Sequence, residues 1–344
     1  MTTSFLLPRL AVVVLNWRQA DATLECVRSV AGSDYDNLDI YVCDNDSQDG
    51  SFEKILSGLS ASLENINALR AAQAHHAFEL AAPSSALMRS DPCIRQHPDD
   101  GIRRITVLDT GKNGGYAYGN NVGLKLALQE SGVDFFWILN NDTVVDRLAA
   151  RGLVDAMRSD ETIGICGSTV LYMNSDKVQT LGGGKFLPWK ARCEQLGTGM
   201  SLGETSAEYD VERSLDYVNG ASAMVTRRFL QTVGLMDEMY FLYYEEIDWA
   251  VRARSAGFRL GYCRESLVYH QVGASSGTAD DGDSSNLSVY YAERSKFKFL
   301  LKHYPSFLLV AIPLLGREYV RRIARRRQAS ANAMLRGAFK AFFR

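Results

Sequence analysis

The sequence predicts an α/β protein with a mostly parallel central sheet flanked by helices. Apolar runs typical of buried strands alternate with helical segments over the first 140 residues. Helical connections of this length join parallel strands through right-handed crossovers. Polar residues or glycine follow each of the first four apolar runs. Because parallel strands end at one edge of a sheet and ligands bind outside that edge, a binding site is expected there.

The predicted elements of the first half follow one another at regular spacing. In chain order we expect a strand over 10–17, a helix over 21–30, a strand over 38–46, a helix from about Ser51, a strand over 103–111, a helix over 120–130 and a strand over 135–142. Asp21 is the predicted N-cap of the first helix. Residues 60–100 lose the pattern, so we expect an insertion that is part helix and part loop.

The second half predicts shorter strands and a helical end. IGICGSTVLY and LDYVNGASAMVTR are strand-like, a helix is expected from Tyr244, and RLGYCRESLVYHQVG predicts a last strand and loop. From Tyr290 onward the pattern is helical and basic. We therefore expect one domain over 8–287, followed by a basic amphipathic helical tail over 288–344.

Charge is distributed unevenly along the chain. The 344 residues carry a net charge of −2, which argues against a general nucleic-acid-binding protein. Residues 288–344, however, contain 13 Lys and Arg against 2 Asp and Glu. Such a tail indicates an anionic partner, either nucleic acid or a membrane surface. Segments such as FLLVAIPLLGREYVRRIARRRQ join apolar and basic residues, which favours an anionic membrane surface over nucleic acid. The alternative is a helix that packs on the core with a solvated basic face.

The cysteines and apolar segments indicate a reducing compartment. The six cysteines are scattered and form no Cys-x-x-Cys pair, so we interpret them as small buried hydrophobic residues. The start of the chain is apolar but lacks a cleavage pattern, and no apolar stretch approaches the roughly 20 residues of a transmembrane helix. The expected location is cytoplasmic, at the inner face of the cell membrane.

Polar residues and glycines at the strand ends are the first candidates for a functional site. They are Asn16 after the first strand, Asp44, Asn45 and Asp46 after the second, Asn113, Gly114 and Gly115 after the third, and Asn140, Asn141 and Asp142 after the fourth. One such end is explained by a local turn, because Asn and Asp favour Asx turns. Four of them at one edge of a sheet favour a ligand site.

Several of these ends carry groups with a definite chemistry. Asp44 can hold a ring N–H or a ribose hydroxyl, or it can belong to a capped turn. The loop GKNGGYAYGNN offers backbone N–H groups to a phosphate at a helix N-terminus. Asp142 suits Mg²⁺ or Mn²⁺ if a diphosphate completes the coordination. His270, after another apolar strand, can add a nitrogen ligand or be a neutral, hydrogen-bonded histidine.

The stretch MDEMYFLYYEEIDWAVRAR concentrates acidic residues among aromatic ones. Asp248 and Arg252 are i, i+4 partners on the expected helix and are predicted to pair. Glu245 and Glu246 lie near its start, where acidic side chains also suit the helix dipole. Crowded carboxylates among aromatic rings raise one another's pKa, which a general base requires.

Taken in series, these motifs resemble the family 2 inverting glycosyltransferases. The resemblance rests on a strand ending in Asn-Trp, then VCDNDSQDGS, KNGGYAYGNNVGL, WILNNDT, VNGASAMVTRR, VGLMDEMYFLYYEEIDWAVRARSAGF and VYHQVGASSG, in the family's order over residues 10–300. Within this family, the motifs most resemble the rhamnosyltransferase-like branch, which builds bacterial surface polysaccharides. The resemblance implies a GT-A fold and a nucleotide-diphosphate sugar donor, with dTDP-rhamnose favoured. It also implies an acceptor hydroxyl on a glycan or lipid-linked molecule.

The resemblance also implies roles for individual residues. Asn140-Asn141-Asp142 stands at the family's Asp-x-Asp motif with its first Asp replaced by Asn, and Asp142 and His270 would bind a divalent metal, Mg²⁺ or Mn²⁺. Glu246 matches the catalytic base, with Glu245 as its rival. Asp44 would recognise the base of the nucleotide. The implied donor-binding residues are Asn16, Asp44, Asn45, Asn113, Gly114, Asn120 and Asn141.

Two other functions stay open on the sequence. The replaced first Asp favours a non-catalytic sugar-nucleotide-binding or scaffold protein of the same fold, which would bind the donor without transfer. A nucleotidyltransferase on a similar sheet would instead release pyrophosphate from a nucleoside triphosphate. The basic glycine-rich loop that this chemistry prefers near the first strand is missing from the sequence.

Overall fold

The computed structural model describes residues 7–82, 103–205, 210–271 and 285–343. The strands are β1 (Arg9–Asn16), β2 (Leu38–Asp44), β3 (Phe78–Ala81), β4 (Arg103–Asp109), β5 (Val133–Asn140), β6 (Thr143–Val145), β7 (Ile163–Tyr172), β8 (Val178–Leu181), β9 (Gly183–Leu187), β10 (Arg192–Gln195), β11 (Tyr217–Val218), β12 (Ser222–Thr226) and β13 (Arg259–His270). The α-helices are α1 (Ala20–Ala31), α2 (Ser51–Ala72), α3 (Gly115–Gln129), α4 (Ala149–Ser159), α5 (Val211–Ser214), α6 (Arg227–Val233), α7 (Glu245–Ser255), α8 (Asn286–His303), α9 (Leu308–Ala324) and α10 (Gln328–Lys340).

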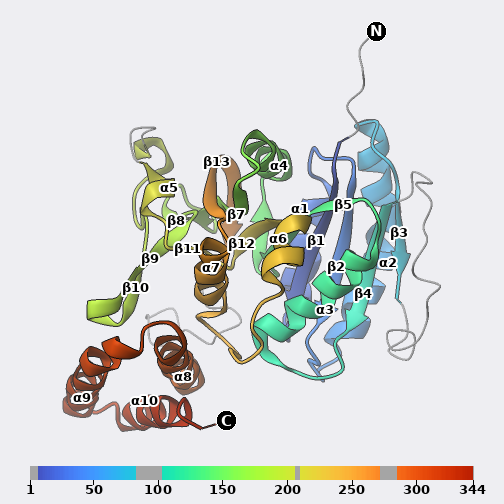
Figure 1. Ribbon diagram of the computed structural model, residues 1–344. Helices are drawn as coiled ribbons and strands as arrows, with labels where there is room; N and C mark the ends of the chain where they lie inside the picture. The colour runs from blue at the N-terminus through green and yellow to red at the C-terminus, as the bar shows by residue number, and fades with distance from the viewer. Residues whose placement is uncertain (1–6, 83–102, 206–209, 272–284, 344) are drawn as a thin grey trace.

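The main layer of the molecule is a ten-stranded sheet with helices on its two faces (Figure 1). Its order is β3-β4-β2-β1-β5-β12-β7-β13-β6, and β8 pairs with β7. β3, β4, β2, β1 and β5 run parallel, and β12 enters antiparallel between β5 and β7. A second, three-stranded sheet has the order β10-β9-β11. The predicted α/β class with a mostly parallel sheet is confirmed.

Both faces of the parallel strands are buried, which explains their continuous apolar sequences. In β1, Val12 lies in a core with residues of α1, α2 and α4, whereas Val13 lies in a second core with residues of α3 and α7. Successive side chains of a strand point to opposite faces, so a sheet covered on both faces needs apolar residues at every position.

The first helix is capped differently from the prediction. α1 starts at Ala20, and Asp21 lies in its first turn, where its exposed carboxylate pairs with Lys54. Gln19 is the N-cap residue, and its own N–H donates to Oδ1 of Asn16 at 3.2 Å. The prediction for Asp21 is wrong because the helix begins one residue before it, at Ala20.

The third helix starts at Gly115, earlier than the predicted residue 120. Gly115 has a φ of +88°, and a Cβ atom added to it would lie 2.1 Å from the carbonyl oxygen of Phe241. The N–H of Tyr116 donates to that same oxygen at 2.7 Å. Contact with a distant segment therefore turns part of the glycine-rich loop into helix, and only glycine fits this conformation and this approach.

The described part of the predicted insertion is more regular than expected. α2 extends to Ala72, and residues 78–81 form β3, an unpredicted edge strand that pairs with β4. The buried side chain of Arg70 holds this edge, since its Nε donates to the carbonyl oxygen of His76 at 2.6 Å. Its guanidinium also lies 4.3 Å from the centre of the Phe78 ring. A four-residue strand of this kind has too short an alternation to be predicted.

The cysteines behave largely as predicted. Four of them are buried and one is half-buried, and none of the described cysteines forms a disulfide. The buried ones are Cys26, Cys43, Cys166 and Cys263, the half-buried one is Cys193, and Cys93 lies outside the described residues.

The C-terminal segment forms three helices that pack together beside the sheet domain (Figure 1). Phe297, Phe299 and Leu300 of α8 belong to the core that contains α3 and α7. The hydroxyl group of Ser295 donates to the carbonyl oxygen of Leu242 at 2.8 Å. α8 is therefore fixed to the sheet domain, and residues of α9 and α10 pack on it in turn. In the described ranges, no helix combines the length and the apolar character needed to cross a membrane.

Candidate functional site

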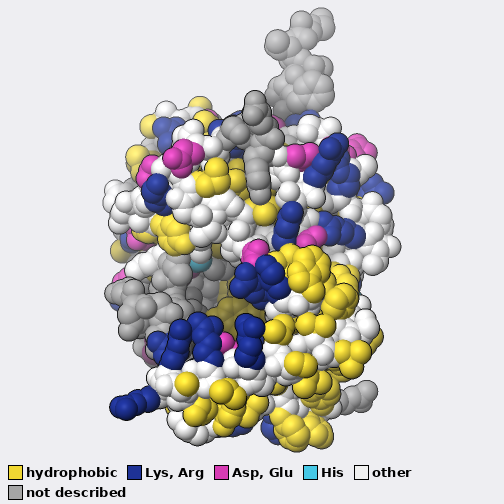
Figure 2. All heavy atoms as spheres, turned by 90° about the vertical axis from the view of Figure 1, so that its left-hand side faces the viewer, with side chains coloured by type: hydrophobic (Ala, Val, Ile, Leu, Met, Phe, Trp, Pro, Cys, Tyr) yellow, Lys and Arg dark blue, Asp and Glu magenta, His cyan; other side chains and the backbone are white. Residues whose placement is uncertain are grey.

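A cavity of about 460 Å³ lies where the central strands end. Its wall comes from strand ends, the start of α3, the segment before α7, the end of β13 and the first turns of α8. The lining residues are Leu15, Trp17, Asn45, Asn113, Gly115, Tyr116, Asn140, Asn141, Asp142, Phe241, Leu242, Tyr243, His270, Leu287, Ser288 and Tyr291. Figure 2 shows that one face of the molecule is hollowed near its middle, with Lys and Arg side chains gathered beside and below the hollow.

The predicted site residues divide into two groups. Asn45, Asn113, Asn141, Asp142 and His270 line the cavity. The others are not among its lining residues: Asn16, Asp44, Gly114, Asn120, Glu245 and Glu246.

Asp142 and His270 meet at one part of the cavity wall. β13 pairs with β6 so that His270 lies opposite Thr143, the residue after Asp142. The Nε2 atom of His270 lies 3.1 Å from Oδ1 of Asp142. Asp142 is 4% exposed, and among the described residues this Oδ1 has no hydrogen-bond partner. A buried carboxylate oxygen rarely lacks a partner, so the atom is suited to a cation.

This pair fits a divalent metal in the type of its ligand atoms but not in their number. A carboxylate oxygen and an imidazole nitrogen are both accepted by Mn²⁺, and Mg²⁺ prefers the oxygen. Within the described ranges, no cluster of three or more His, Cys, Asp or Glu side chains could hold a metal ion. Water, or water and a diphosphate, would complete the coordination of an ion at this position, which is how Mg²⁺ is commonly held.

A buried hydrogen-bond network fixes the ends of β1, β2 and β5 relative to one another. Asn16 Nδ2 donates to Asp44 Oδ1 at 2.5 Å, and Ser47 donates to the same carboxylate from its hydroxyl and its backbone N–H. Asn141 Nδ2 donates to Thr23 Oγ1 at 3.0 Å and to Asn16 Oδ1 at 3.3 Å. Asn16 and Asp44 thus support the strand ends from behind the cavity.

The glycine-rich loop closes the cavity wall beside this network. Asn113 Oδ1 accepts from Asn45 Nδ2 at 3.0 Å and from a backbone N–H of the loop. Asn120 is fully buried on α3 and donates to the carbonyl oxygen of Tyr116 at 3.0 Å. The side-chain amides of Asn45 and Asn113 therefore hold each other in place at the cavity surface. Asn120 lies further along α3 and is buried away from the cavity lining.

Glu245 and Glu246 occupy the first turn of α7. The Oε2 atoms of both are inaccessible to solvent, and neither atom has a hydrogen-bond partner in the described part of the chain. Burial raises the pKa of Glu246 to about 7. Burial, followed by the adjacent charge of Glu246, raises the pKa of Glu245 well above its usual range. The predicted direction of these shifts is confirmed, and Glu246 is the carboxylate of the two that ionises near neutral pH.

The pKa of Tyr116 depends both on the two glutamates and on Asp142, the carboxylate beside His270. Its side chain lines the cavity, and its hydroxyl donates to the carbonyl oxygen of Gly220 at 2.6 Å. Burial raises the pKa of Tyr116 well above its usual value, and the charges of Glu245, Glu246 and Asp142 raise it further. The phenol of Tyr116 therefore senses the charge of both glutamates and of Asp142.

The cavity wall formed by residues 241–243 and α8 was not predicted. The rings of Phe241 and Tyr291 stack with their centres 4.3 Å apart and an interplanar angle of 18°. Tyr243 and Tyr244 have φ values of +66° and +71°. Such conformations cost about 1–3 kcal/mol each for residues other than glycine and cluster at functional sites. The aromatic residues beside the Glu-Glu pair could have indicated this wall, but nothing in the sequence indicated that α8 completes it.

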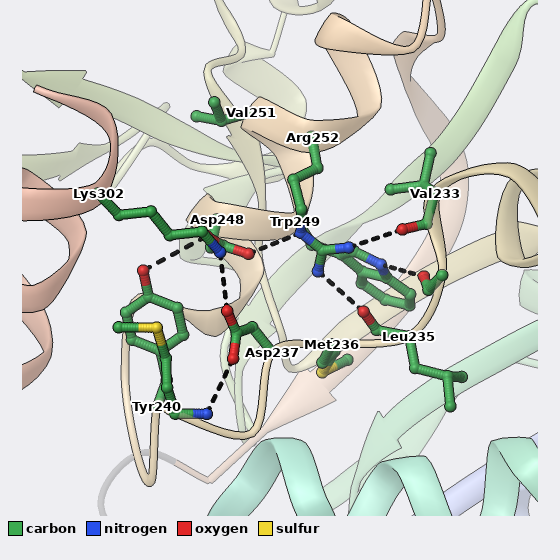
Figure 3. A network of polar contacts seen from close by, with 12 residues as sticks. Val233, Leu235, Met236, Asp237, Tyr240, Asp248, Trp249, Val251, Arg252 and Lys302 are labelled. Carbon is green, nitrogen blue, oxygen red and sulfur yellow. Dashed lines mark hydrogen bonds and ion pairs between the residues drawn. The ribbon is translucent and has the colours of Figure 1, made fainter. Parts of the chain in front are cut away.

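Asp248 is the centre of a polar network that ties α7 to α8 (Figure 3). Its fully buried carboxylate accepts from Arg252 Nε at 2.7 Å, Lys302 Nζ at 2.6 Å and His303 Nε2 at 2.7 Å. The predicted pair with Arg252 is confirmed, whereas the two partners from α8 were not predicted. Burial alone would raise the pKa of Asp248, but hydrogen bonds from His303, Lys302 and Arg252 outweigh it and hold the pKa well below its usual range.

The chain is similar in sequence to curated glycosyltransferases. It is 28% identical over 170 residues to the low-salt glycan biosynthesis hexosyltransferase Agl10 of Haloferax volcanii, covering 48% of this chain and 52% of that protein. It is 22% identical over 211 residues to the dTDP-rhamnosyl transferase RfbF of Shigella flexneri, covering 60% of this chain and 67% of that protein. The chain thus spans about half the length of Agl10 and about two thirds of RfbF. No protein-family model matches it.

Solved structures with a similar fold include two glycosyltransferases. GalNAc-T7 with UDP, GalNAc and Mn²⁺ has a TM-score of 0.57 at 15% identity, over 86% of this chain and 48% of that chain. The mannosyltransferase PcManGT from Pyrobaculum calidifontis, in complex with GDP-Man and Mn²⁺, has a TM-score of 0.52 at 13% identity, over 98% of this chain and 87% of that chain. The chain therefore has the GT-A fold, as the sequence predicted. Its curated relatives in sequence are glycosyltransferases as well.

Proposed function

We propose that the protein is an inverting glycosyltransferase that moves a sugar from a nucleotide diphosphate to an acceptor hydroxyl. The observation that supports this best is the Asp142–His270 pair in the wall of the cavity where the strands end. Asp142, paired with His270, has a buried oxygen suited to a cation, and Glu246 ionises near neutral pH. A cation for the diphosphate and a base for the acceptor are the two groups that an inverting transfer needs.

In this proposal the residues of the chain divide the work between donor and acceptor. Glu246 takes the proton from the acceptor hydroxyl as the oxygen attacks the anomeric carbon from the face opposite the leaving group. Asp142 and His270 would hold Mg²⁺ or Mn²⁺. The metal, when bound, neutralises charge on the departing nucleotide diphosphate.

The donor-binding assignments from the sequence are kept as part of the proposal. Asn45, Asn113 and Asn141 present amides at the cavity surface, where they can contact the diphosphate or ribose. Asp44 would recognise the nucleotide base if the donor displaced one of its present hydrogen bonds. The remaining proposed donor-side residues, set back from the cavity lining, are Asn16, Gly114 and Asn120.

The finer identity of the substrates rests on similarity in sequence. We propose dTDP-rhamnose as the donor because RfbF is a dTDP-rhamnosyl transferase and the motifs resemble the rhamnosyltransferase-like branch. Agl10 acts in glycan biosynthesis, which agrees with a glycan or lipid-linked acceptor. The proposed setting is the synthesis of bacterial surface polysaccharide in the cytoplasm.

The first test is a calorimetric titration of the protein with dTDP, UDP and GDP, each with Mn²⁺ and with EDTA. We expect one nucleotide, dTDP, to bind in a manner that requires Mn²⁺. An Asp142→Ala variant should lose most of this binding, because it lacks the buried carboxylate, while its folding stays intact by circular dichroism. Binding of no nucleotide would contradict the proposed function. Metal-dependent binding without any transfer would favour the non-catalytic alternative.

We also propose that α9 and α10 dock on an anionic membrane. Exposed apolar side chains lie on both helices and just after the second, namely Leu309, Ile312 and Val320 on α9, Phe339 on α10 and Phe343 beyond its end. Basic residues lie among them, namely Arg317, Arg321, Arg325, Arg326, Arg327, Arg336 and Lys340. Interfacial helices combine these two kinds of residue, and each basic one adds about 1 kcal/mol against anionic lipid.

Vesicle sedimentation tests the docking surface. The protein should sediment with vesicles of phosphatidylglycerol and phosphatidylcholine but only weakly with phosphatidylcholine alone. Replacing Leu309, Ile312 and Val320 together by Ser should lower the bound fraction at least tenfold. A Leu69→Ser variant is the matched control, because Leu69 is equally exposed but lies on α2. Equal binding of the triple variant and the control, or binding that ignores lipid charge, would overturn the proposal.

A further inference from the structure

We infer that Gln179 is a positioning residue that selects the tautomer of His270 and so prepares its Nε2 atom to bind the metal. Gln179 was not among the sequence candidates and does not line the cavity. The inference rests on the metal site of the proposed function, and it adds a residue from a different strand to that site.

Gln179 lies on β8 at an irregularity that directs its side chain. Val170 of β7 pairs with Thr180, but the next residue, Leu171, pairs with Val178, so Gln179 is the extra residue of a β-bulge. Bulges beside functional sites commonly re-aim one side chain. The carbonyl oxygen of Gln179 accepts from Thr198 Oγ1 at 2.9 Å, which fixes its backbone.

The hydrogen bonds around the imidazole define which ring nitrogen carries the proton. The Oε1 atom of Gln179, which can only accept, lies 2.9 Å from His270 Nδ1. The Nδ2 atom of Asn140, which can only donate, lies 3.3 Å from His270 Nε2. Both contacts are satisfied when Nδ1 carries the proton and Nε2 offers its lone pair.

In this tautomer two acceptors face each other. The unprotonated Nε2 atom of His270, which accepts from Asn140, lies 3.1 Å from Oδ1 of Asp142, an oxygen with no hydrogen-bond partner among the described residues. The negative partial charges of these two atoms repel in a buried site, and a cation bound to both would remove the repulsion and replace the Asn140 hydrogen bond at Nε2. The other tautomer would place a proton on Nε2, where it could bond to Asp142 and occupy both metal-binding atoms at once. Gln179 disfavours that tautomer because it would leave Oε1 without a donor.

The test compares two variants, of which only one keeps an acceptor for His270 Nδ1. Gln179→Met keeps the length of the side chain but has no comparable acceptor, whereas Gln179→Glu keeps the acceptor. The readout is the affinity for Mn²⁺ alone, measured from the electron paramagnetic resonance signal of free Mn²⁺ with the full-length protein. Removing such an outer partner of a metal-binding histidine typically lowers affinity 10- to 100-fold. We expect that loss for Gln179→Met, and an affinity within about threefold of wild type, or tighter, for Gln179→Glu.

Several outcomes would overturn the inference. If Gln179→Met bound Mn²⁺ as tightly as wild type, the glutamine would not matter for the metal. Equal weakening in both variants would mean that Gln179 only fills space. If the wild type bound no Mn²⁺, or if the His270→Ala variant bound it as tightly as the wild type, the metal site itself would be absent. The proposed function can fail independently of this inference. A protein that shows the expected Mn²⁺ affinities but binds no nucleotide would have the metal site without the transferase function.

Discussion

Replacing Glu246 by Gln should lower the rate of sugar transfer by about 10²- to 10⁴-fold, while donor and metal binding stay close to wild type. A positioned general base typically contributes that much to a rate. Gln has nearly the same shape as Glu but cannot accept a proton, so the variant isolates the proton transfer. The measurement is the single-turnover rate at saturating donor and acceptor, alongside calorimetry of donor binding.

The pH dependence provides a second readout of the same assignment. Because burial raises the pKa of Glu246 to about 7, the ionised fraction rises nearly tenfold per pH unit below 7 and levels off above it. The wild-type rate should follow this curve. Glu245→Gln is the matched control and should keep the curve, since in this assignment Glu245 does not take the acceptor proton. If Glu245→Gln lost activity instead and Glu246→Gln retained it, the roles of the two residues would be reversed.

Replacing Asp248 by Asn should lower the free energy of unfolding by about 3–5 kcal/mol. Removing one member of a buried ion pair has an effect of this size, because the remaining charges lose their partner away from water. Here the carboxylate is fully buried and binds three basic side chains, from Arg252, Lys302 and His303. Urea unfolding of the two proteins at pH 7 measures the difference.

Protonation of Asp248 should make the free energy of unfolding depend on pH in the acid range. The hydrogen bonds that outweigh its burial hold the pKa of Asp248 below the ordinary value of 3.8, so the stability they provide is fully present above about pH 5. It is lost as the pH falls below 4, and the Asp248→Asn variant should lose less stability over this range than wild type.

Asp237→Asn is the matched control for this prediction. Asp237 also pairs with Lys302, at 2.7 Å, but both side chains of that pair are about one-third exposed. Solvent screening limits such a pair to roughly 1 kcal/mol or less. If both variants lost the same stability, burial of Asp248 would not be the reason for its contribution.

Local patterns predicted the side chains that strand ends bring together. Asp142 follows β5 and His270 ends β13, and the pairing of β13 with β6 brings them to 3.1 Å. Their meeting was predictable because apolar runs locate strands and strand ends share an edge. The direction of the Glu245 and Glu246 pKa shifts was predictable for a similar reason, since crowding and burial are visible in the sequence as acidic residues among aromatic ones.

Contacts between distant segments were beyond such patterns. α3 begins at Gly115 because the carbonyl oxygen of Phe241 accepts a hydrogen bond from the Tyr116 N–H in its first turn, and no local signal indicates that contact. Gln179 reaches His270 through a one-residue bulge, which shifts the face on which a side chain emerges. Tyr291 lines the cavity from a helix that the sequence assigned to a separate tail. In each case the contact joins residues that are distant in the sequence, so the pattern of neighbouring residues does not predict it.

The double attachment of α8 bears on how this protein can be divided and how its sequence can change. One end of the helix supplies Leu287 and Tyr291 to the cavity, and the other supplies Lys302 and His303 to Asp248. A cut at the predicted boundary near residue 287 would open the cavity and leave a buried carboxylate without two of its three basic partners. The C-terminal helices are therefore not an exchangeable module. A tail transplanted from a relative would work only together with the residues it contacts, so these two parts of the gene are constrained to vary as one unit.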